Sequence, residues 1–321
     1  MSFFDPRIGE YTAKGNSCSC KSIAALLKNA GLGVAAISYD SPAVLKEFAK
    51  RKSITFPLLS DHESDVIRHY GVANRQYRKG MQLDVDQERI YTNSIGFVPV
   101  FGLSYPAVFV LTRDHRVKWR FVSEGAELRL TGAALLSEVV PGIADENRAP
   151  VSSNHHIQVT ATASDNAVGL GNRFRISVEL KIPKGFHVYS PEVGGDYRGV
   201  AWRMDPTDCL VIGDAVYPEA ERKLMSSTNE TLPVYENTLR ISREIIVRPM
   251  IKASDATVYE RFSHSCLDAA SHIRVSGVLT FQACDPQQCY PPQTVVPKWS
   301  FQFLKPDRQR SPGELRRELE P

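Results

Sequence analysis

Four of the six cysteines form two close pairs that could carry out thiol chemistry. Cys284 and Cys289 flank a four-residue segment that begins with Asp285-Pro286, a dipeptide that favours a chain reversal. A disulfide needs Cα atoms within about 7 Å of each other, and a reversal can bring two cysteines that close. Such a pair either cycles between dithiol and disulfide or closes its loop permanently, and the spacing leaves both interpretations open.

The second pair, Cys18 and Cys20, precedes a segment with helical periodicity at residues 23–30. At a helix N-terminus the helix dipole and the free N–H groups favour the thiolate form of a cysteine. A bridge between cysteines this close would close a small, strained ring that is easily reduced. Two unpaired thiols are the alternative.

The remaining candidates point to no metal and no cofactor. His264, Cys266 and His272 lack the closely spaced second pair that would complete a zinc site. Cys209 is expected to be a small buried apolar residue. No glycine-rich loop follows a predicted strand in the way that phosphate binding requires.

Composition excludes several classes of partner. The formal net charge is only +3, so we expect no nucleic-acid partner. No apolar run approaches the roughly 18 residues that a membrane span needs. The first residues lack the pattern of a secretory signal, which predicts a cytoplasmic protein or one whose export signal is absent from this chain.

Residues 20–145 alternate between helical periodicity and short apolar runs, which predicts an α/β domain. Ser41-Pro42 predicts a helix start, and residues 105–112 and 117–122 predict two strands. A closing helix is expected at 131–140. Residues 1–15 contain no convincing strand, so the sheet is expected to be incomplete at its N-terminal end.

Beyond residue 150 the periodicity changes to two, as in the alternating segment 174–182. Many short strands joined by glycine and proline turns predict an all-β, immunoglobulin-like sandwich. The polar stretch 145–154, with Pro150 inside it, is interpreted as a linker. We therefore predict domains at 1–148 and 149–306 and a charged tail at 307–321.

Residues 151–305 resemble the N-terminal domain of the thiol:disulfide interchange protein DsbD. The resemblance rests on Ala-Cys284-x4-Cys289-Tyr290-Pro-Pro, on Lys184-Gly-Phe-His187-Val-Tyr189-Ser-Pro191, on Tyr217-Pro218 and on the closing segment 295–301. It implies that Cys284 and Cys289 are the redox pair, with His187 and Tyr189 on a neighbouring strand and Tyr290 in support. It also implies a cap loop over the pair, within residues 217–235.

Residues 18–140 resemble the thioredoxin-fold AhpC/TSA (peroxiredoxin) family. The resemblance rests on residues 33–40, Phe56-Pro-Leu-Leu-Ser-Asp61, His69-Tyr-Gly-Val72 and Tyr105-Pro106-Ala-Val-Phe-Val-Leu. It implies that Pro106 is the cis-proline beside the active-site cysteine. Cys20 aligns with one of the two cysteines of such relatives, whereas Cys18 is offset by one position.

Together these resemblances predict a thiol-disulfide oxidoreductase that uses Cys284 and Cys289 and relays electrons to or from the thioredoxin-like domain. The expected partners are protein thiols and disulfides, including a membrane electron donor or a thioredoxin-like protein, and the implied compartment is the periplasm. The first alternative is a binding module with a structural disulfide and a degraded first domain. The second is a peroxidase that uses Cys20.

Overall fold

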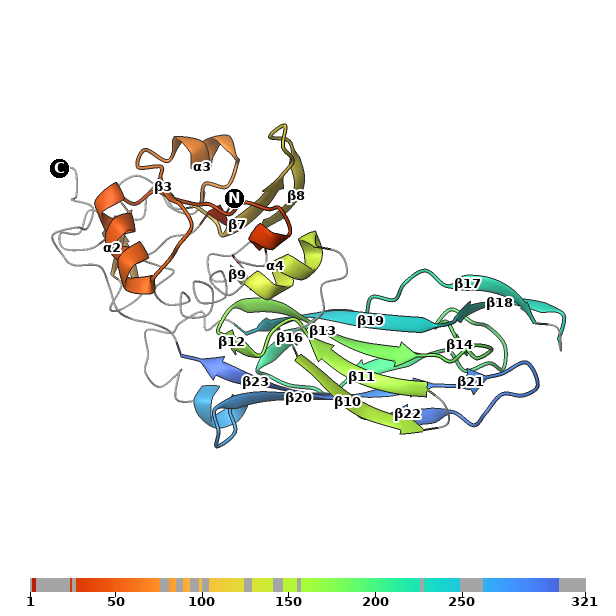
Figure 1. The fold of residues 1–321 in the computed structure, drawn as a ribbon. Helices are drawn as coiled ribbons and strands as arrows, with labels where there is room; N and C mark the ends of the chain where they lie inside the picture. Colours follow the sequence, from red (N-terminus) through yellow and green to blue (C-terminus); the bar gives the residue numbers. More distant parts are fainter. Residues whose placement is uncertain are drawn as a thin grey trace.

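The computed structural model of the chain describes a list of separate segments: residues 2–3, 24, 27–75, 81–84, 89–92, 98–99, 104–123, 129–140, 147–154, 157–225, 228–248 and 262–305. Figure 1 shows two parts, a mixed α/β part early in the chain and an elongated β-sandwich later in it. This arrangement confirms the predicted fold class.

The α/β part is built on a five-stranded sheet with the order β3-β2-β1-β7-β8. Its strands are β1 (Ser2–Phe3), β2 (Ala36–Ser38), β3 (Leu58–Ser60), β7 (Ala107–Leu111) and β8 (Val117–Val122). Its helices are α2 (Pro42–Lys52), α3 (Asp65–His69) and α4 (Gly132–Val139). A separate antiparallel sheet contains β4 (Met81–Asp84), β5 (Arg89–Thr92) and β6 (Val98–Pro99).

Local capping explains where two of these helices begin. The Ser41 side chain accepts a hydrogen bond from the backbone N–H of Val44, and Pro42 occupies the first turn of α2, as predicted. The Asp61 carboxylate accepts from the N–H groups of Val66 and Ile67 at the start of α3. These caps satisfy N–H groups that the helices themselves leave unpaired.

The expectation that the sheet is incomplete at its N-terminal end is wrong, because residues 2–3 form β1. β1 lies between β2 and β7, parallel to β2 and antiparallel to β7. Two residues are too few to show any periodicity, so the pattern at residues 1–15 could not reveal this strand.

The sandwich contains two large sheets and a smaller one. The first has the order β10-β11-β13-β19-β16, and the second has the order β12-β23-β20-β15 with β22 also paired to β20. The smaller sheet has the order β17-β18-β14-β21. The strands are β10 (Asn147–Asn154), β11 (Ile157–Ala163), β12 (Ala167–Gly169), β13 (Asn172–Lys181), β14 (His187–Tyr189), β15 (Ala201–Met204), β16 (Leu210–Ile212), β17 (Glu221–Met225), β18 (Glu230–Tyr235), β19 (Thr238–Val247), β20 (His272–Phe281), β21 (Ala283–Cys284), β22 (Gln293–Val295) and β23 (Lys298–Leu304).

The core of the sandwich follows the predicted alternation. Phe174, Ile176, Val178 and Leu180 on β13 are all buried. Phe174 meets Phe301 of the opposite sheet edge to face, with ring centroids 4.8 Å apart. The apolar face of each sheet therefore packs on the other.

The interpretation of residues 145–154 as a linker is wrong over most of its length. Residues 147–154 form β10, which pairs antiparallel with β11 at the edge of the first large sheet. The register shifts between Pro150 and Ser152. Proline lacks a backbone donor and is tolerated on edge strands and at bulges, so Pro150 concealed the strand in the sequence.

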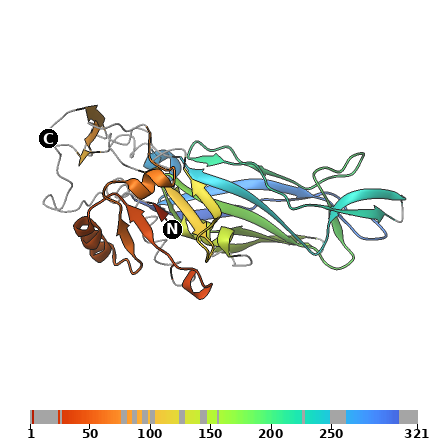
Figure 2. The ribbon, with the colours of Figure 1, turned by 90° about the horizontal axis from the view of Figure 1, so that it is seen from above.

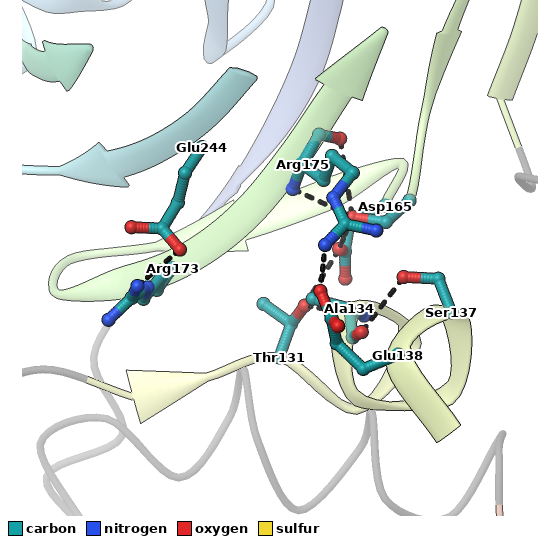
Figure 3. A network of polar contacts seen from close by, with 9 residues as sticks. Thr131, Ala134, Ser137, Glu138, Asp165, Arg173, Arg175 and Glu244 are labelled. Atoms are coloured by element: carbon teal, nitrogen blue, oxygen red, sulfur yellow. Dashed lines mark hydrogen bonds and ion pairs between the residues drawn. The ribbon is translucent and has the colours of Figure 1, made fainter. Parts of the chain in front are cut away.

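The two parts meet at one end of β13. β9 (Arg129–Leu130) pairs in parallel with Asn172 and Arg173, the first two residues of β13. As Figure 3 shows, Glu138 on α4 forms an ion pair with Arg175. The Thr131 hydroxyl donates to the Asp165 carboxylate at 2.7 Å and accepts from the N–H of Ala134 at the start of α4.

In the part of the chain that the structure describes, every helix is too short or too polar to cross a bilayer.

Candidate functional site

Cys284 and Cys289 are joined by a disulfide at the tip of the sandwich. Their Cα atoms are 4.0 Å apart, and the chain between them reverses direction. The Asp285 carboxylate holds the reversal by accepting hydrogen bonds from the N–H groups of Gln287 and Gln288, both at 2.8 Å. The turn expected from Asp285-Pro286 is therefore present, and an Asp side chain that bonds the backbone ahead of it stabilises such turns.

The two sulfur-bearing residues differ in their access to solvent. Cys284, on β21, is only 1% exposed, whereas Cys289 lies in the exposed part of the loop. An incoming thiol or disulfide therefore reaches Cys289 first. Thiol–disulfide exchange depends on which sulfur can be approached, so the two cysteines would differ in any exchange at this disulfide.

Strand β14 places two aromatic side chains beside the disulfide. In the antiparallel pairing, His187 lies opposite Cys284 and Val188 lies opposite Ala283. Val188 and Ala283 belong to the main core, so His187, Tyr189 and Cys284 share the other face. The Tyr189 hydroxyl is 3.7 Å from the Cys289 sulfur, and the His187 and Tyr189 rings meet edge to face at 5.1 Å.

The β17–β18 hairpin covers the face that carries Tyr189 and Cys284. Met225 and Val234 are buried and pack with Tyr189 and Cys284 in one apolar cluster. This hairpin lies inside residues 217–235, where the resemblance implies a cap. The side chains that make the contact are apolar, and their spacing in the sequence did not by itself predict that they would pack on the cysteine pair.

Tyr197 and Glu230 complete the surroundings, and sequence analysis gave neither of them a role. The Tyr197 ring packs on Tyr189 at 4.9 Å, and its hydroxyl donates to Glu230 at 2.5 Å. Burial raises the pKa of Tyr189, and Tyr197 and Glu230 raise it further. The Tyr189 phenol therefore keeps its proton and can donate a hydrogen bond to a sulfur anion.

His187 is a buried imidazole with an unused hydrogen-bonding atom. The side chain is 5% exposed, and its Nε2 has no hydrogen-bond partner. Burial lowers the pKa of His187, and Lys223 lowers it further, while Glu236 and Asp285 act in the opposite direction. The imidazole is therefore neutral at pH 7.

Tyr290 supports the loop from its other side. Its hydroxyl donates to the Asp285 carboxylate at 2.8 Å, and its N–H donates to the Ala283 carbonyl at 2.9 Å. Its ring stacks on Phe186 with centroids 5.9 Å apart. These contacts fix the base of the loop.

Of the candidates in the first domain, the structure describes only Pro106. Cys18 and Cys20 lie outside the described residues. Pro106 lies just before β7, and its backbone carbonyl accepts a hydrogen bond from the N–H of Ser123 at 2.8 Å. The described residues contain no cis peptide bond, so the expected cis-proline at Pro106 is wrong. The trans form is the ordinary state of a peptide bond before proline.

The expectation for Cys209 is also wrong, because Cys209 and Cys266 form a second disulfide with Cα atoms 5.6 Å apart. Cys209 is buried, as expected, but it is bonded. This disulfide also excludes Cys266 as a zinc ligand. The two cysteines are 57 residues apart, and no local pattern could have paired them.

The Cys284–Cys289 disulfide lies far from the contact that the described residues of the first domain make with β13. The first domain contacts β13 at Asn172 and Arg173, whereas His187 and Cys284 lie beyond the other end of that strand. Ten residues of strand at about 3.3 Å each separate the two ends by about 30 Å. Figures 1 and 2 agree, since β14, β17, β18 and β21 lie at the end of the sandwich away from the α/β part.

The chain thus joins a thioredoxin-like sheet to a β-sandwich that carries a cysteine pair, one sulfur buried and one exposed, at its tip. Comparison with known families agrees: residues 12–120 match the AhpC/TSA family, and residues 155–298 match the family described as thiol:disulfide interchange protein DsbD, N-terminal. The chain therefore contains one region similar to the AhpC/TSA family and one similar to the DsbD N-terminal family, and both families are oxidoreductase-related.

Two solved structures are similar to part of this chain. The N-terminal domain of Neisseria meningitidis DsbD in its reduced form aligns at 17% identity and a TM-score of 0.25, covering 40% of this chain and 82% of that domain. The N-terminal periplasmic domain of Proteus mirabilis ScsB aligns at 17% identity and a TM-score of 0.29, covering 53% of this chain. The aligned part spans about half (54%) of the ScsB structure. No curated protein matches the chain.

Proposed function

We propose that this protein is a thiol-disulfide oxidoreductase in which Cys289 meets the partner and Cys284 resolves the mixed disulfide. The observation that carries the proposal is the pairing of a buried sulfur with an exposed one in a single disulfide. A purely structural disulfide needs no such difference in access. Exchange does, because the partner must reach one sulfur while the other stays close enough to complete the reaction.

In the reducing direction the chemistry runs in two steps. The Cys289 thiolate attacks a partner disulfide, a bond forms between Cys289 and one partner sulfur, and the other partner sulfur leaves as a thiolate. The Cys284 thiol then loses its proton and attacks Cys289, and the second partner sulfur leaves. Two electrons pass to the partner, and Cys284 and Cys289 end as a disulfide.

Single-cysteine variants test this assignment of roles. After reduction, Cys284→Ala should accumulate a stable mixed disulfide with glutathione at Cys289 when glutathione disulfide is added. Cys289→Ala should react far more slowly, because its remaining sulfur is buried. Intact-protein mass spectrometry detects the adduct, and equal adduct formation in both variants would contradict the assignment.

For partners, we propose protein thiols and disulfides presented by a thioredoxin-like protein or a membrane electron donor. The match to the DsbD N-terminal family supports this choice, and the ScsB relative is described as periplasmic. The periplasm is the compartment we propose, since disulfides persist in oxidising compartments. The sequence predicts domains at 1–148 and 149–306 with a tail at 307–321, and we propose the same division with the boundary moved to just before Asn147, because β10 pairs with β11 of the sandwich.

A direct relay between the two cysteine pairs of one chain has less support. About 30 Å of strand separates Cys284 from the place where the first domain contacts β13. Thiol exchange requires sulfurs in bonding contact, so we propose that a separate carrier protein connects the two halves. Peroxide reduction at Cys20 stays a prediction, and sulfenic acid at Cys20 after brief peroxide exposure is its test.

A further inference from the structure

We propose that His187 Nε2 accepts the proton of the Cys284 thiol when Cys284 resolves the mixed disulfide. This inference rests on the proposed function, because it concerns the second step of the same exchange. It gives a chemical role to a residue that the resemblance only placed beside the sulfurs.

The position of His187 is the first support. His187 and Cys284 are direct partners across two antiparallel strands. Side chains of such partners stand on the same face, with Cβ atoms about 4.5–5.5 Å apart. On the other side of β14, Tyr189 is paired with Val234 of β18, and both side chains are buried and pack with Cys284 in one apolar cluster.

The second support is the unused nitrogen of His187. Nε2 is buried and makes no hydrogen bond, and buried polar atoms without partners are uncommon in folded proteins. Disulfide sulfurs have no proton, so the oxidised pair cannot donate a hydrogen bond to Nε2. Reduction gives Cys284 an S–H group, which is a donor that fits this acceptor.

The third support is the need for a base at a buried thiol. Burial in apolar surroundings holds a thiol protonated, yet only the thiolate attacks a disulfide. Cys284 is 1% exposed, so solvent has little access to remove its proton. A neutral imidazole on the neighbouring strand provides the acceptor that solvent does not.

The proton balance of the step is complete. The proton moves from Cys284 Sγ to His187 Nε2, and the Cys284 thiolate forms a bond with Cys289 Sγ. The bond between Cys289 and the partner sulfur breaks, and the partner leaves as a thiolate that takes the proton from the imidazolium. His187 ends neutral, as it began.

Charged and titratable groups from several elements face this imidazole. They are Lys223 on β17, Glu236 after β18, Asp285 in the cysteine loop and Tyr189 on β14 itself. Lys223 pairs with Glu236, so part of its field at His187 is compensated. The pH dependence of the resolving step should therefore follow the imidazole, whose titration lies below its ordinary range.

A two-step assay separates attack from resolution. The full chain, carrying Cys18→Ser and Cys20→Ser, is reduced only at Cys284 and Cys289, as verified by mass spectrometry, and mixed with the aromatic disulfide dithiobis(nitrobenzoate). The first coloured thiolate released reports attack by Cys289, and the second reports resolution by Cys284. Cys284→Ser in this background should release only the first.

His187→Gln keeps an acceptor oxygen but takes up no proton, and His187→Phe keeps the aromatic shape. We expect both variants to slow the second release by about 100-fold, in the range of general base catalysis. The first release should change by less than about two-fold. His264→Asn, at an exposed imidazole elsewhere, is the matched control and should leave both releases unchanged.

The pH profile distinguishes proton transfer from support of the fold. In the Cys18→Ser/Cys20→Ser chain with His187 intact, the rate of the second release should level off once the imidazole is neutral, below about pH 7. In His187→Gln this rate should keep rising toward the thiol range near about pH 8.5. Unchanged second release in both variants would overturn the role of His187. So would a background profile that keeps rising to the thiol range, even if the variants do not fold. Absence of a second release in the Cys18→Ser/Cys20→Ser chain with His187 intact would instead refute the proposed function itself.

Discussion

The Tyr189 hydroxyl lies 3.7 Å from the Cys289 sulfur, and the two residues are 100 positions apart in the chain. The contact exists because β14 and β21 pair at the tip of the sandwich and turn Tyr189 toward the cysteine loop. The exposed sulfur thus has a phenol beside it, and the buried sulfur has an imidazole opposite it. Each residue of the pair has its own polar neighbour.

We predict that Tyr189→Phe lowers the reactivity of Cys289. A hydrogen bond to a charged group contributes about 1.5–3 kcal/mol, so its loss should raise the pKa of the Cys289 thiol by about one unit or more. The measurement is the rate of alkylation by iodoacetamide against pH in a Cys284→Ala background. Tyr197→Phe is the control, since its hydroxyl bonds Glu230 rather than sulfur, and an equal effect of the two substitutions would contradict the prediction.

His187 should make the folded protein less stable in mild acid. Its pKa is lowered from 6.5 mainly by burial, so the unfolded chain binds the proton at a higher pH than the folded chain does. The folded protein therefore has its full stability, as far as His187 affects it, above the pKa of His187 in the unfolded chain. This stability falls as the pH drops from about 6.5 toward the pKa of His187 in the folded chain. The free energy of unfolding of oxidised protein, measured from about pH 7.5 to 5, should fall more steeply than that of His187→Asn. Parallel curves would exclude this contribution.

Thr131→Ala should weaken the junction between the two parts of the chain. The hydroxyl caps α4 and also donates to the buried Asp165 carboxylate. Loss of such a cap costs about 1–2 kcal/mol, and the weakened support of Asp165 acts in the same direction. Denaturant unfolding of Thr131→Ala and Thr131→Ser provides the comparison, and the serine variant, which keeps the hydroxyl, should retain most of the stability. Equal losses in both variants would show that the hydroxyl is not responsible.

The second disulfide should stabilise the fold without taking part in exchange. Cys209 and Cys266 close a loop with a separation of 57 residues, which corresponds to about 4 kcal/mol of chain entropy in the unfolded state. Cys209 adjoins β16, and Leu210 of β16 pairs with Val247 at the end of β19. That end of β19 lies beside the start of β13, away from the end near Cys284. The double variant Cys209→Ser/Cys266→Ser should therefore unfold at much lower denaturant, while folded protein exchanges disulfides at an unchanged rate. A parallel loss of exchange in the folded variant would link the two disulfides.

Replacing both Cys18 and Cys20 with serine should leave exchange at Cys284 and Cys289 unchanged. The length of β13, about 30 Å, separates Cys284 from the place where the first domain contacts that strand. The test is the rate at which the reduced chain transfers electrons to glutathione disulfide, with and without the two substitutions. A several-fold change would restore the direct relay within one chain.

The sequence predicted those features whose causes are local. Alternation in β13 and the Ser41-Pro42 start of α2 both depend on residues within a few positions of each other. The turn at Asp285-Pro286 is of the same kind, which is why the tip of the site could be anticipated.

The features that sequence analysis missed depend on contacts between distant segments or on very short elements. Cys209 and Cys266 meet only because the sandwich folds, and Tyr197 reaches Tyr189 from an irregular segment without periodicity. β1 is two residues long, and Pro150 disguised an edge strand. The difference in exposure between Cys284 and Cys289 likewise arises from packing of the β17–β18 hairpin, which no spacing of residues reveals.

The most direct test of the proposed exchange is a redox titration of Cys284 and Cys289. The protein is equilibrated over a series of glutathione or dithiothreitol potentials, alkylated, and analysed by peptide mass spectrometry. We predict reversible titration between roughly −300 and −120 mV, the range of exchange-active dithiols. A pair that resists reduction in the folded protein, with a potential below about −300 mV, would identify a structural disulfide and contradict the proposal.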